Sequence, residues 1–237
     1  MNRVLFEAVE IGKRLALEDE RIQHVFNVLG RQIGEPFDAG IVDGKSGKAK
    51  ISDVGNGWAE LVFDLDTEEP PLPPIHLIVG LSRPQTNRKI LQEATALGVG
   101  SIAFVLTERG EPSYARSKLW TTGEWRRHII AGASQAFTTR IPAVTFGSRL
   151  EDALSTLDQD CEKIAMDNYE ANDHVAELDI DPESVAIAFG SERGWTGSER
   201  DELRRANFRL AHLGPRPLRT ETAVVAGLAF LNQRFCR

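Results

Sequence analysis

Two stretches near the C-terminal end decide the fold: residues 189–196 (FGSERGWT) and 213–223 (LGPRPLRTETA). Each follows an apolar run and opens onto a helical pattern, so each is predicted to be a strand-to-helix turn with free backbone N–H groups. Gly190, Gly194 and Gly214 would let a ligand approach the backbone closely. Ligands of open parallel sheets bind outside the carboxyl ends of the strands, which is where both turns are expected. The spacing matches neither a Walker A loop nor G-x-G-x-x-G, which disfavours the standard nucleotide motifs.

Upstream of these turns, apolar runs alternate with helical patterns from residue 75 onwards. Thr196 and Glu199 form a possible capping box for the helix that follows the first turn. The alternation predicts an α/β domain with a mainly parallel sheet. Strands are expected at 75–81, 101–107, 143–146, 163–166, 185–189 and 209–213, and helices at about 86–97, 124–137, 196–206 and 222–234.

The first 70 residues have a different pattern, with one helix at 22–29 and strands at 36–42, 48–54 and 58–64. Turn residues separate these runs, so a small antiparallel barrel or sheet is predicted. Residues 70–74 contain four prolines, which exclude regular structure and stiffen the chain. We therefore expect a β-rich domain over 1–69, a linker over 70–74 and an α/β domain over 75–237.

Composition excludes several classes of protein. The 237 residues carry a net charge of −7 and two cysteines, so neither a polycationic surface nor a disulfide scaffold is expected. No apolar leader and no run of about 20 apolar residues is present, and a cytoplasmic location without membrane contact is predicted. The histidines lack metal-ligand spacing, and no nucleophile elbow is found.

Basic residues gather in three places, and each cluster is either a phosphate-contacting face or ordinary solvated surface. For a single cluster the ordinary surface is the better supported interpretation. The clusters are Lys45, Lys48 and Lys50; Arg83, Arg88 and Lys89; and Arg126, Arg127 and His128.

The segment 219–222 also has a purely structural interpretation. Thr220 would cap the last helix, Glu221 would complement the helix dipole, and Arg219 would pair with a nearby carboxylate. Taken alone, the segment favours neither this interpretation nor a functional one.

The order of the motifs resembles the RsmE-type 16S ribosomal RNA uracil-N3 methyltransferases of the SPOUT superfamily. Residues 213–223 are similar to that family's Leu-Gly-x-Arg-Ile-Leu-Arg-Thr-Glu-Thr-Ala block, and weaker similarities occur at 94–99, 107–109 and 140–142. The resemblance implies a trefoil-knotted C-terminal domain with a mainly parallel sheet, preceded by a small PUA-like β-barrel domain that binds RNA.

The resemblance also implies a cofactor, partners and site residues. S-adenosylmethionine would be bound by the knot loops of a homodimer that acts on small-subunit ribosomal RNA, and no metal is expected. Glu221 is the candidate base for the N3 proton of uracil, and Arg219 or Arg216 the candidate stabiliser of the uracil anion. The cofactor-binding residues implied are Gly190, Glu192, Gly194, Leu213, Gly214, Leu218 and Arg219.

The loop 190–194 departs from the family's Gly-Pro-Glu-Gly-Gly, because it reads Gly-Ser-Glu-Arg-Gly. Arg193 would be strained if its position requires a positive φ. Two alternatives therefore accompany the methyltransferase hypothesis. One is a divergent paralogue that binds RNA or a ligand without methylating it, and the other is a methyltransferase that modifies a different RNA or nucleobase.

Overall fold

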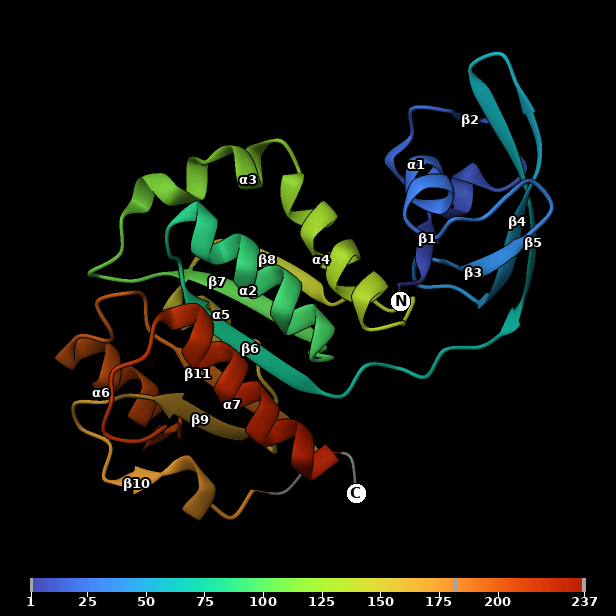
Figure 1. The fold of residues 1–237 in the computed structure, drawn as a ribbon. Helices are drawn as coiled ribbons and strands as arrows, with labels where there is room; N and C mark the ends of the chain where they lie inside the picture. Colours follow the sequence, from blue (N-terminus) through green and yellow to red (C-terminus); the bar gives the residue numbers. More distant parts are fainter. Residues whose placement is uncertain (1, 181–182, 236–237) are drawn as a thin grey trace. The chain divides into compact units, whose positions relative to one another are not determined.

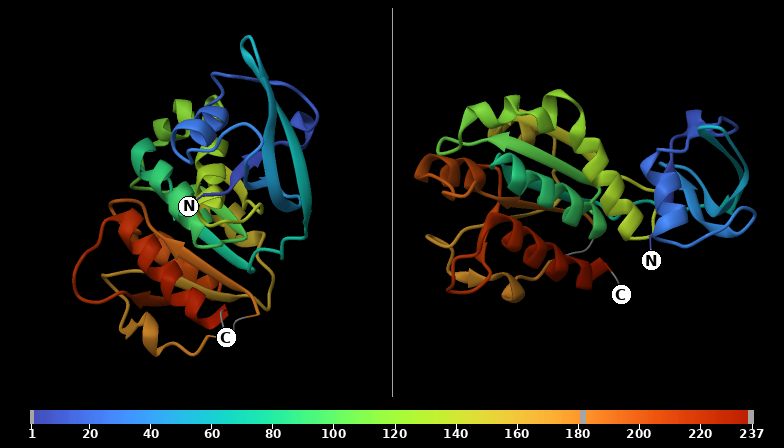
Figure 2. Two further views of the ribbon diagram at one scale, coloured as in Figure 1. Left: turned by 45° about the vertical axis from the view of Figure 1, so that its right-hand side comes forward. Right: turned by 45° about the horizontal axis from the view of Figure 1, so that its top comes forward.

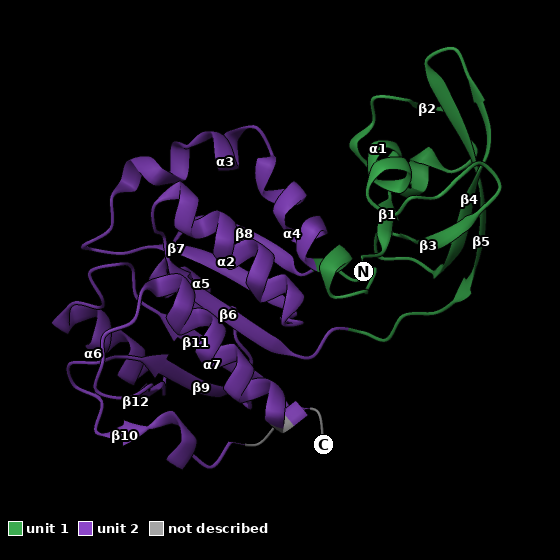
Figure 3. Cartoon of the chain, in the orientation of Figure 1, with its two compact units in different colours: residues 1–71, 133–141 green, residues 72–132, 142–237 purple. Residues whose placement is uncertain are grey.

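The structure is a computed structural model that describes residues 2–180 and 183–235. Two compact units make up the chain (Figure 3). The first contains the chain up to residue 71 together with residues 133–141, and the second contains 72–132 and the chain from 142 onwards. The proline-rich segment 70–74 forms neither helix nor strand.

The first unit is a five-stranded sheet that curls around one helix, α1 (Glu20–Asn27) (Figure 1). The helix and the three long strands expected from the sequence are present, and the sheet forms a half-barrel. Phe6, Ile22 and Phe37 lie in its core and are almost completely buried. The strand order is β1 (Val4–Phe6), β3 (Pro36–Ile41), β4 (Ser46–Gly55), β5 (Trp58–Thr67) and β2 (Leu15–Ala16), with only the β1–β3 pair parallel.

Residues 133–141 belong to the first unit through hydrogen bonds to its strands and turns. The backbone N–H of Arg3 donates to the carbonyl of Ser134 at 3.1 Å. The Thr139 hydroxyl donates to the carbonyl of Gly44 at 2.6 Å, and the Arg140 guanidinium donates to the carbonyl of Asp43 at 2.9 Å. The unit is therefore assembled from two stretches of chain that are separated by about 60 residues of the other unit.

The second unit is built on a seven-stranded sheet in which every pairing is parallel. This confirms the predicted α/β class. The trefoil knot that the resemblance implies is a property of chain threading, and it stays a prediction. The strand order is β10 (Asp173–His174), β12 (Arg209–His212), β9 (Glu162–Met166), β11 (Val185–Phe189), β6 (Ile75–Gly80), β7 (Ser101–Leu106) and β8 (Ala143–Arg149).

Helices cover both faces of this sheet (Figure 2), and every residue of β11 is buried as a result. Ile187 and Phe189 face α7 (Thr220–Phe235), where Gly227 lies close to the Phe189 ring and to the Ile187 side chain. Ala186 and Ala188 face the opposite way and pack in a core with α5 (Leu150–Ser155) and α6 (Gly197–Arg205). The helix α2 (Pro84–Ala96) lies beside α7, and α3 (Lys118–Thr121) and α4 (Glu124–Gln135) follow β7.

Most sequence expectations for this unit are confirmed, including the capping box that starts α6. The Thr196 hydroxyl accepts from the Glu199 N–H, and the Glu199 carboxylate accepts from the Thr196 N–H. The sequence did not indicate β2, β10, α3 or α5, because elements of two to six residues are too short to show a period.

One close approach fixes the centre of the sheet. A Cβ on Gly80, the last residue of β6, would lie only 2.3 Å from the backbone nitrogen of Ser191. A Cβ on Gly190 would lie 2.8 Å from the carbonyl carbon of Gly194. Both contacts are with backbone, which cannot rotate away as a side chain can. Glycine is therefore required at Gly80 so that the loop after β11 can fold over the end of β6, and at Gly190 so that this loop can turn back on itself at Gly194.

We expect Gly80→Ala to lower the free energy of unfolding by about 2 kcal/mol, because overpacking a tight backbone contact costs roughly 1–3 kcal/mol. Urea unfolding followed by circular dichroism measures the change. Gly197→Ala is the matched control. Gly197 is the first residue of α6, and a Cβ at this position meets nothing within 4 Å. Equal stability of the two variants would contradict the close approach.

Candidate functional site

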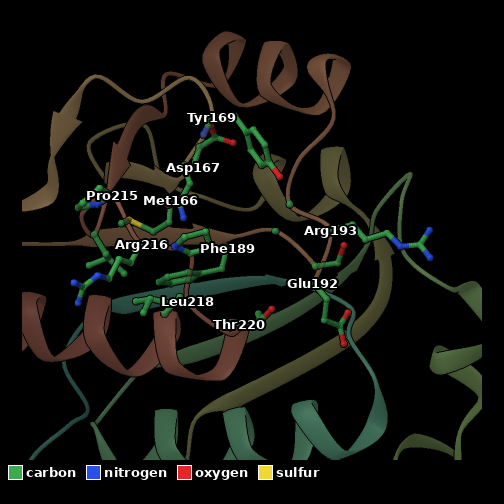
Figure 4. Close-up of a pocket in the computed structure, with 17 residues that line it drawn as sticks. Met166, Asp167, Tyr169, Phe189, Glu192, Arg193, Pro215, Arg216, Leu218 and Thr220 are labelled. Atoms are coloured by element: carbon green, nitrogen blue, oxygen red, sulfur yellow. The ribbon is translucent and has the colours of Figure 1, made fainter.

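A cavity of about 280 Å³ lies where β9, β11 and β12 end (Figure 4). Three segments line it: 166–169, 189–194 and 213–220, with Ala223 of α7 closing one side. All three segments follow the carboxyl ends of parallel strands, which is where such sheets bind ligands. Both turns singled out in the sequence therefore meet at one cavity.

The loop 190–194 is a tight turn closed by a hydrogen bond from the Gly194 N–H to the carbonyl of Ser191 at 2.8 Å. Gly194 adopts the positive φ, +67°. Arg193 does not have a positive φ, so the strain considered for it is absent. Its side chain is exposed and points away from the other residues of the cavity (Figure 4). The departure from the family's loop therefore leaves the turn itself unobstructed.

Two hydrogen bonds between a side chain and the backbone join this turn to neighbouring loops. The Glu192 carboxylate accepts from the backbone N–H of Arg83 at 2.9 Å. The Arg109 guanidinium donates to the carbonyl of Arg193 at 3.1 Å. Arg109 follows β7 in the 107–109 motif, which gives that motif a physical role in positioning the turn.

The neighbouring residue Glu108 connects the same loop to the start of α6. Its backbone N–H donates to the Glu199 carboxylate at 2.7 Å, and its own carboxylate accepts from the Ser198 hydroxyl at 2.6 Å. These contacts join residues about 90 positions apart in the chain. The turn and the helix that follows it are thus fixed to the end of β7.

The segment 166–169 was missed by the sequence reasoning. Asp167 is buried, and its carboxylate accepts from the backbone N–H groups of Tyr169 and Glu170 at 2.8 and 2.7 Å. Its second oxygen accepts from Nε of Arg200, a buried side chain of α6, at 2.8 Å. Tyr169 stays 75% exposed at the edge of the cavity. Because β9 was predicted to end at Met166, the carboxyl-end rule applied to that strand would have found this segment.

The segment 213–219 contributes Leu213, Arg216 and Leu218 to the cavity. Gly214 does not line it, but it has a φ of +112° and donates its N–H to Nδ1 of His212 at 3.0 Å. The helix α7 begins at Thr220, and the Arg219 carbonyl accepts from the Ala223 N–H at 2.8 Å. Arg219, and not Thr220, therefore occupies the position before the helix, which corrects the expected cap.

Arg219 and Glu221 lie on a second cavity of about 650 Å³ that adjoins the first. The Lys89 ammonium is 3.2 Å from the Glu221 carboxylate. A hydrogen bond from the backbone N–H of Glu221 itself and this ion pair lower the pKa of that carboxyl below its usual value. The predicted residues are thus divided between two cavities. Gly190, Glu192, Gly194, Leu213, Arg216 and Leu218 line the smaller one, and Glu192, Leu218, Arg219 and Glu221 line the larger one.

The smaller cavity suits a ligand with apolar and polar parts. Met166, Phe189, Leu213 and Leu218 supply apolar walls, and the loop 190–194 supplies backbone groups. The Ser191 hydroxyl is buried without a hydrogen-bond partner among the described residues. Among the residues that the structure describes, no group of three His, Cys, Asp or Glu side chains is placed to hold a metal ion. No described helix is long and apolar enough to cross a membrane.

Comparison with known proteins identifies the family. Residues 68–232 match the family described as an RNA methyltransferase domain, so the chain belongs to that family. Ribosomal RNA small subunit methyltransferase E of Treponema pallidum is 36% identical over 97% of this chain and 90% of its own length. The protein of the same name from Bacillus subtilis is 24% identical over 95% of this chain and 92% of its own length. The resemblance to the RsmE-type family is confirmed.

Solved structures agree with this assignment. Ribosomal RNA small subunit methyltransferase E of Neisseria gonorrhoeae, bound to S-adenosyl methionine, superposes with a TM-score of 0.78 at 26% identity. The match covers 98% of this chain and 97% of that one. Both units are therefore included in the similarity, and the confirmed fold class extends to the full chain.

We expect Arg200→Leu to lower the free energy of unfolding by about 3 kcal/mol, because breaking a buried ion pair leaves the Asp167 carboxylate without its cation. Arg204→Gln is the matched control on the same helix. Its ion pairs with Glu170 and Asp201 are exposed, so little or no change is expected. Denaturant unfolding measures the free energy of unfolding of both variants. An unchanged free energy of unfolding in Arg200→Leu would contradict the structural role of the pair.

Proposed function

We propose that this protein uses S-adenosylmethionine to methylate N3 of a uridine in 16S ribosomal RNA. The observation that supports the proposal is the cavity shared by the ends of β9, β11 and β12, lined by residues of the 213–223 block and the 190–194 loop. The full-length similarity to ribosomal RNA small subunit methyltransferase E supports the same reaction class and the same substrate.

The smaller cavity is a physically reasonable site for this cofactor. Leu218 and Met166 would contact the apolar parts, and the backbone N–H groups of the loop would bind the polar ones. The Ser191 hydroxyl, which lacks a partner among the described residues, would gain one when a polar ligand enters. The positive φ of Gly194 and the absence of a side chain at Gly190 leave the backbone accessible.

The bound cofactor would supply an electrophilic methyl group. The chain must then present a uracil whose N3 proton is removed. Glu221 is a carboxylate that can accept a proton, and the lowered pKa of that group makes it a weaker base than an ordinary glutamate. Arg219, and Arg216 in the adjoining cavity, are the cations proposed to stabilise the uracil anion. We infer that alignment of the two reactants provides much of the acceleration.

We also propose a homodimer that acts in the cytoplasm, where ribosomal RNA is modified. The family resemblance supports the dimer, and light scattering on the purified protein tests it. The curled sheet of the first unit is proposed to bind RNA, as the resemblance to PUA-like domains implies.

We expect Leu218→Ala to weaken the binding of S-adenosylmethionine about five- to tenfold, since burying a leucine side chain against a ligand contributes roughly 1–1.5 kcal/mol. Leu218 is 42% exposed, so the free energy of unfolding should hardly change. Isothermal titration calorimetry measures the affinity. Ile33→Ala, an exposed residue of the first unit, is the control and should bind the cofactor normally. Unchanged affinity in Leu218→Ala would place the cofactor elsewhere.

The reaction itself is tested by deleting the gene and mapping the methylation of ribosomal RNA by mass spectrometry. We expect one N3-methyluridine to disappear from 16S ribosomal RNA and to return when the wild-type chain is supplied. Complementation with Arg219→Ala is expected to leave the site unmethylated while the protein stays folded. Survival of the modification in the deletion strain would refute the proposed substrate, and failure of the purified protein to bind S-adenosylmethionine would refute the proposed activity.

A further inference from the structure

The larger cavity, of about 650 Å³, is formed by elements far apart in the sequence. Arg83 immediately precedes α2 and Lys89 lies in its second turn, whereas Arg219 immediately precedes α7 and Glu221 lies in its first turn. Residues 83–89 contain one of the three basic clusters in the sequence. Three other basic residues of these clusters already form ion pairs: Lys45 with Glu68, Lys48 with Asp38, and Arg88 with Glu124.

This cavity shares a wall with the smaller one. Glu192, Pro217, Leu218 and Thr220 line both. A methyl group can be transferred only when the acceptor atom lies against it at van der Waals distance, so the acceptor must enter from a space that adjoins the donor's. Of the two cavities described here, the larger one meets that requirement.

The charge of the larger cavity suits an anionic polymer. The guanidinium groups of Arg83 and Arg219 form no ion pair within the described residues, and both side chains are exposed. The Lys89 ammonium is 59% exposed and pairs with Glu221 at 3.2 Å. Such an exposed pair contributes little stability, so a phosphate can compete for Lys89. Three cations thus surround a space that is large enough for a nucleotide, and the two carboxylates of the lining already have partners: Glu192 accepts from the Arg83 N–H and Glu221 pairs with Lys89.

We propose that the larger cavity is the subsite for the target nucleotide, in which a flipped-out pyrimidine lies against the shared wall and the flanking phosphates are bound by Arg83 and Lys89. This inference rests on the proposed function. A base must leave its stack before N3 is accessible, and the cavity offers the flipped nucleotide a space of its own. Arg219, on the same cavity, then lies on the substrate side of the wall.

The test uses the full-length variants Arg83→Gln and Lys89→Gln. The substrate is 16S ribosomal RNA from the deletion strain, and transfer of a radiolabelled methyl group is measured. Arg83→Gln removes the guanidinium but keeps the backbone N–H that Glu192 accepts, so the loop 190–194 stays in place. Lys118→Gln is the matched control, because Lys118 is exposed on the same unit and lines neither cavity.

Each variant is expected to raise KM for the RNA about tenfold, because a hydrogen-bonded charge contact is lost. The dependence of log KM on log salt concentration should become shallower by about 0.7 for each phosphate contact removed. Affinity for S-adenosylmethionine should not change, because neither side chain lines the smaller cavity. Lys118→Gln should match the wild type in all three measurements.

Two results would overturn the inference and leave the proposed function intact. The first is a wild-type KM and salt dependence in both variants, with normal cofactor binding and turnover. The second is a change of oligomeric state in the variants by light scattering, which would assign the cavity to an interface between two copies of the chain. By contrast, a wild-type protein that binds no S-adenosylmethionine would refute the proposed function and this inference with it.

Discussion

The site depends on one steric constraint: the loop after β11 folds over the end of β6 with no room for a side chain between them. Gly80 makes this approach possible, Gly190 lets the loop close on itself at Gly194, and Gly194 supplies the positive φ that reverses the chain. Because β6 and β11 are hydrogen-bonded neighbours at the centre of the sheet, the constraint also sets where the segments after β9 and β12 can meet. The cavity between them follows from it.

The loop 190–194 is also positioned by hydrogen bonds that join side chains to backbone atoms. Glu192 accepts from the Arg83 N–H, Arg109 donates to the Arg193 carbonyl, and Glu108 and Glu199 join the neighbouring elements. Bonds to backbone atoms tolerate changes in the residue that supplies the atom. This explains how Arg193 can replace a glycine of the family pattern while the turn keeps its shape.

The sequence was sufficient to predict the α/β class, most of the long strands and helices, and the importance of 190–194 and 213–223. It did not indicate Asp167, whose role depends on a buried partner, Arg200, that lies 33 residues away on another element. Nor did it indicate that Arg219 and Glu221 would lie on a different cavity from Leu213 and Gly190. That division depends on the direction in which each side chain points at the start of α7. Residues that are close in sequence point in different directions there, so the sequence alone does not assign them to a cavity.

The short stretch 133–141 has a consequence for synthesis. The first unit contains residues up to 71, yet it lacks the partners of Arg3, Asp43 and Gly44 until residue 141 has been added. During translation, β6, α2 and β7 therefore emerge before the N-terminal unit can be completed. The N-terminal unit therefore begins first but cannot complete its fold until part of the second unit has been synthesised. A fragment cut at the proline-rich segment would contain an incomplete N-terminal unit.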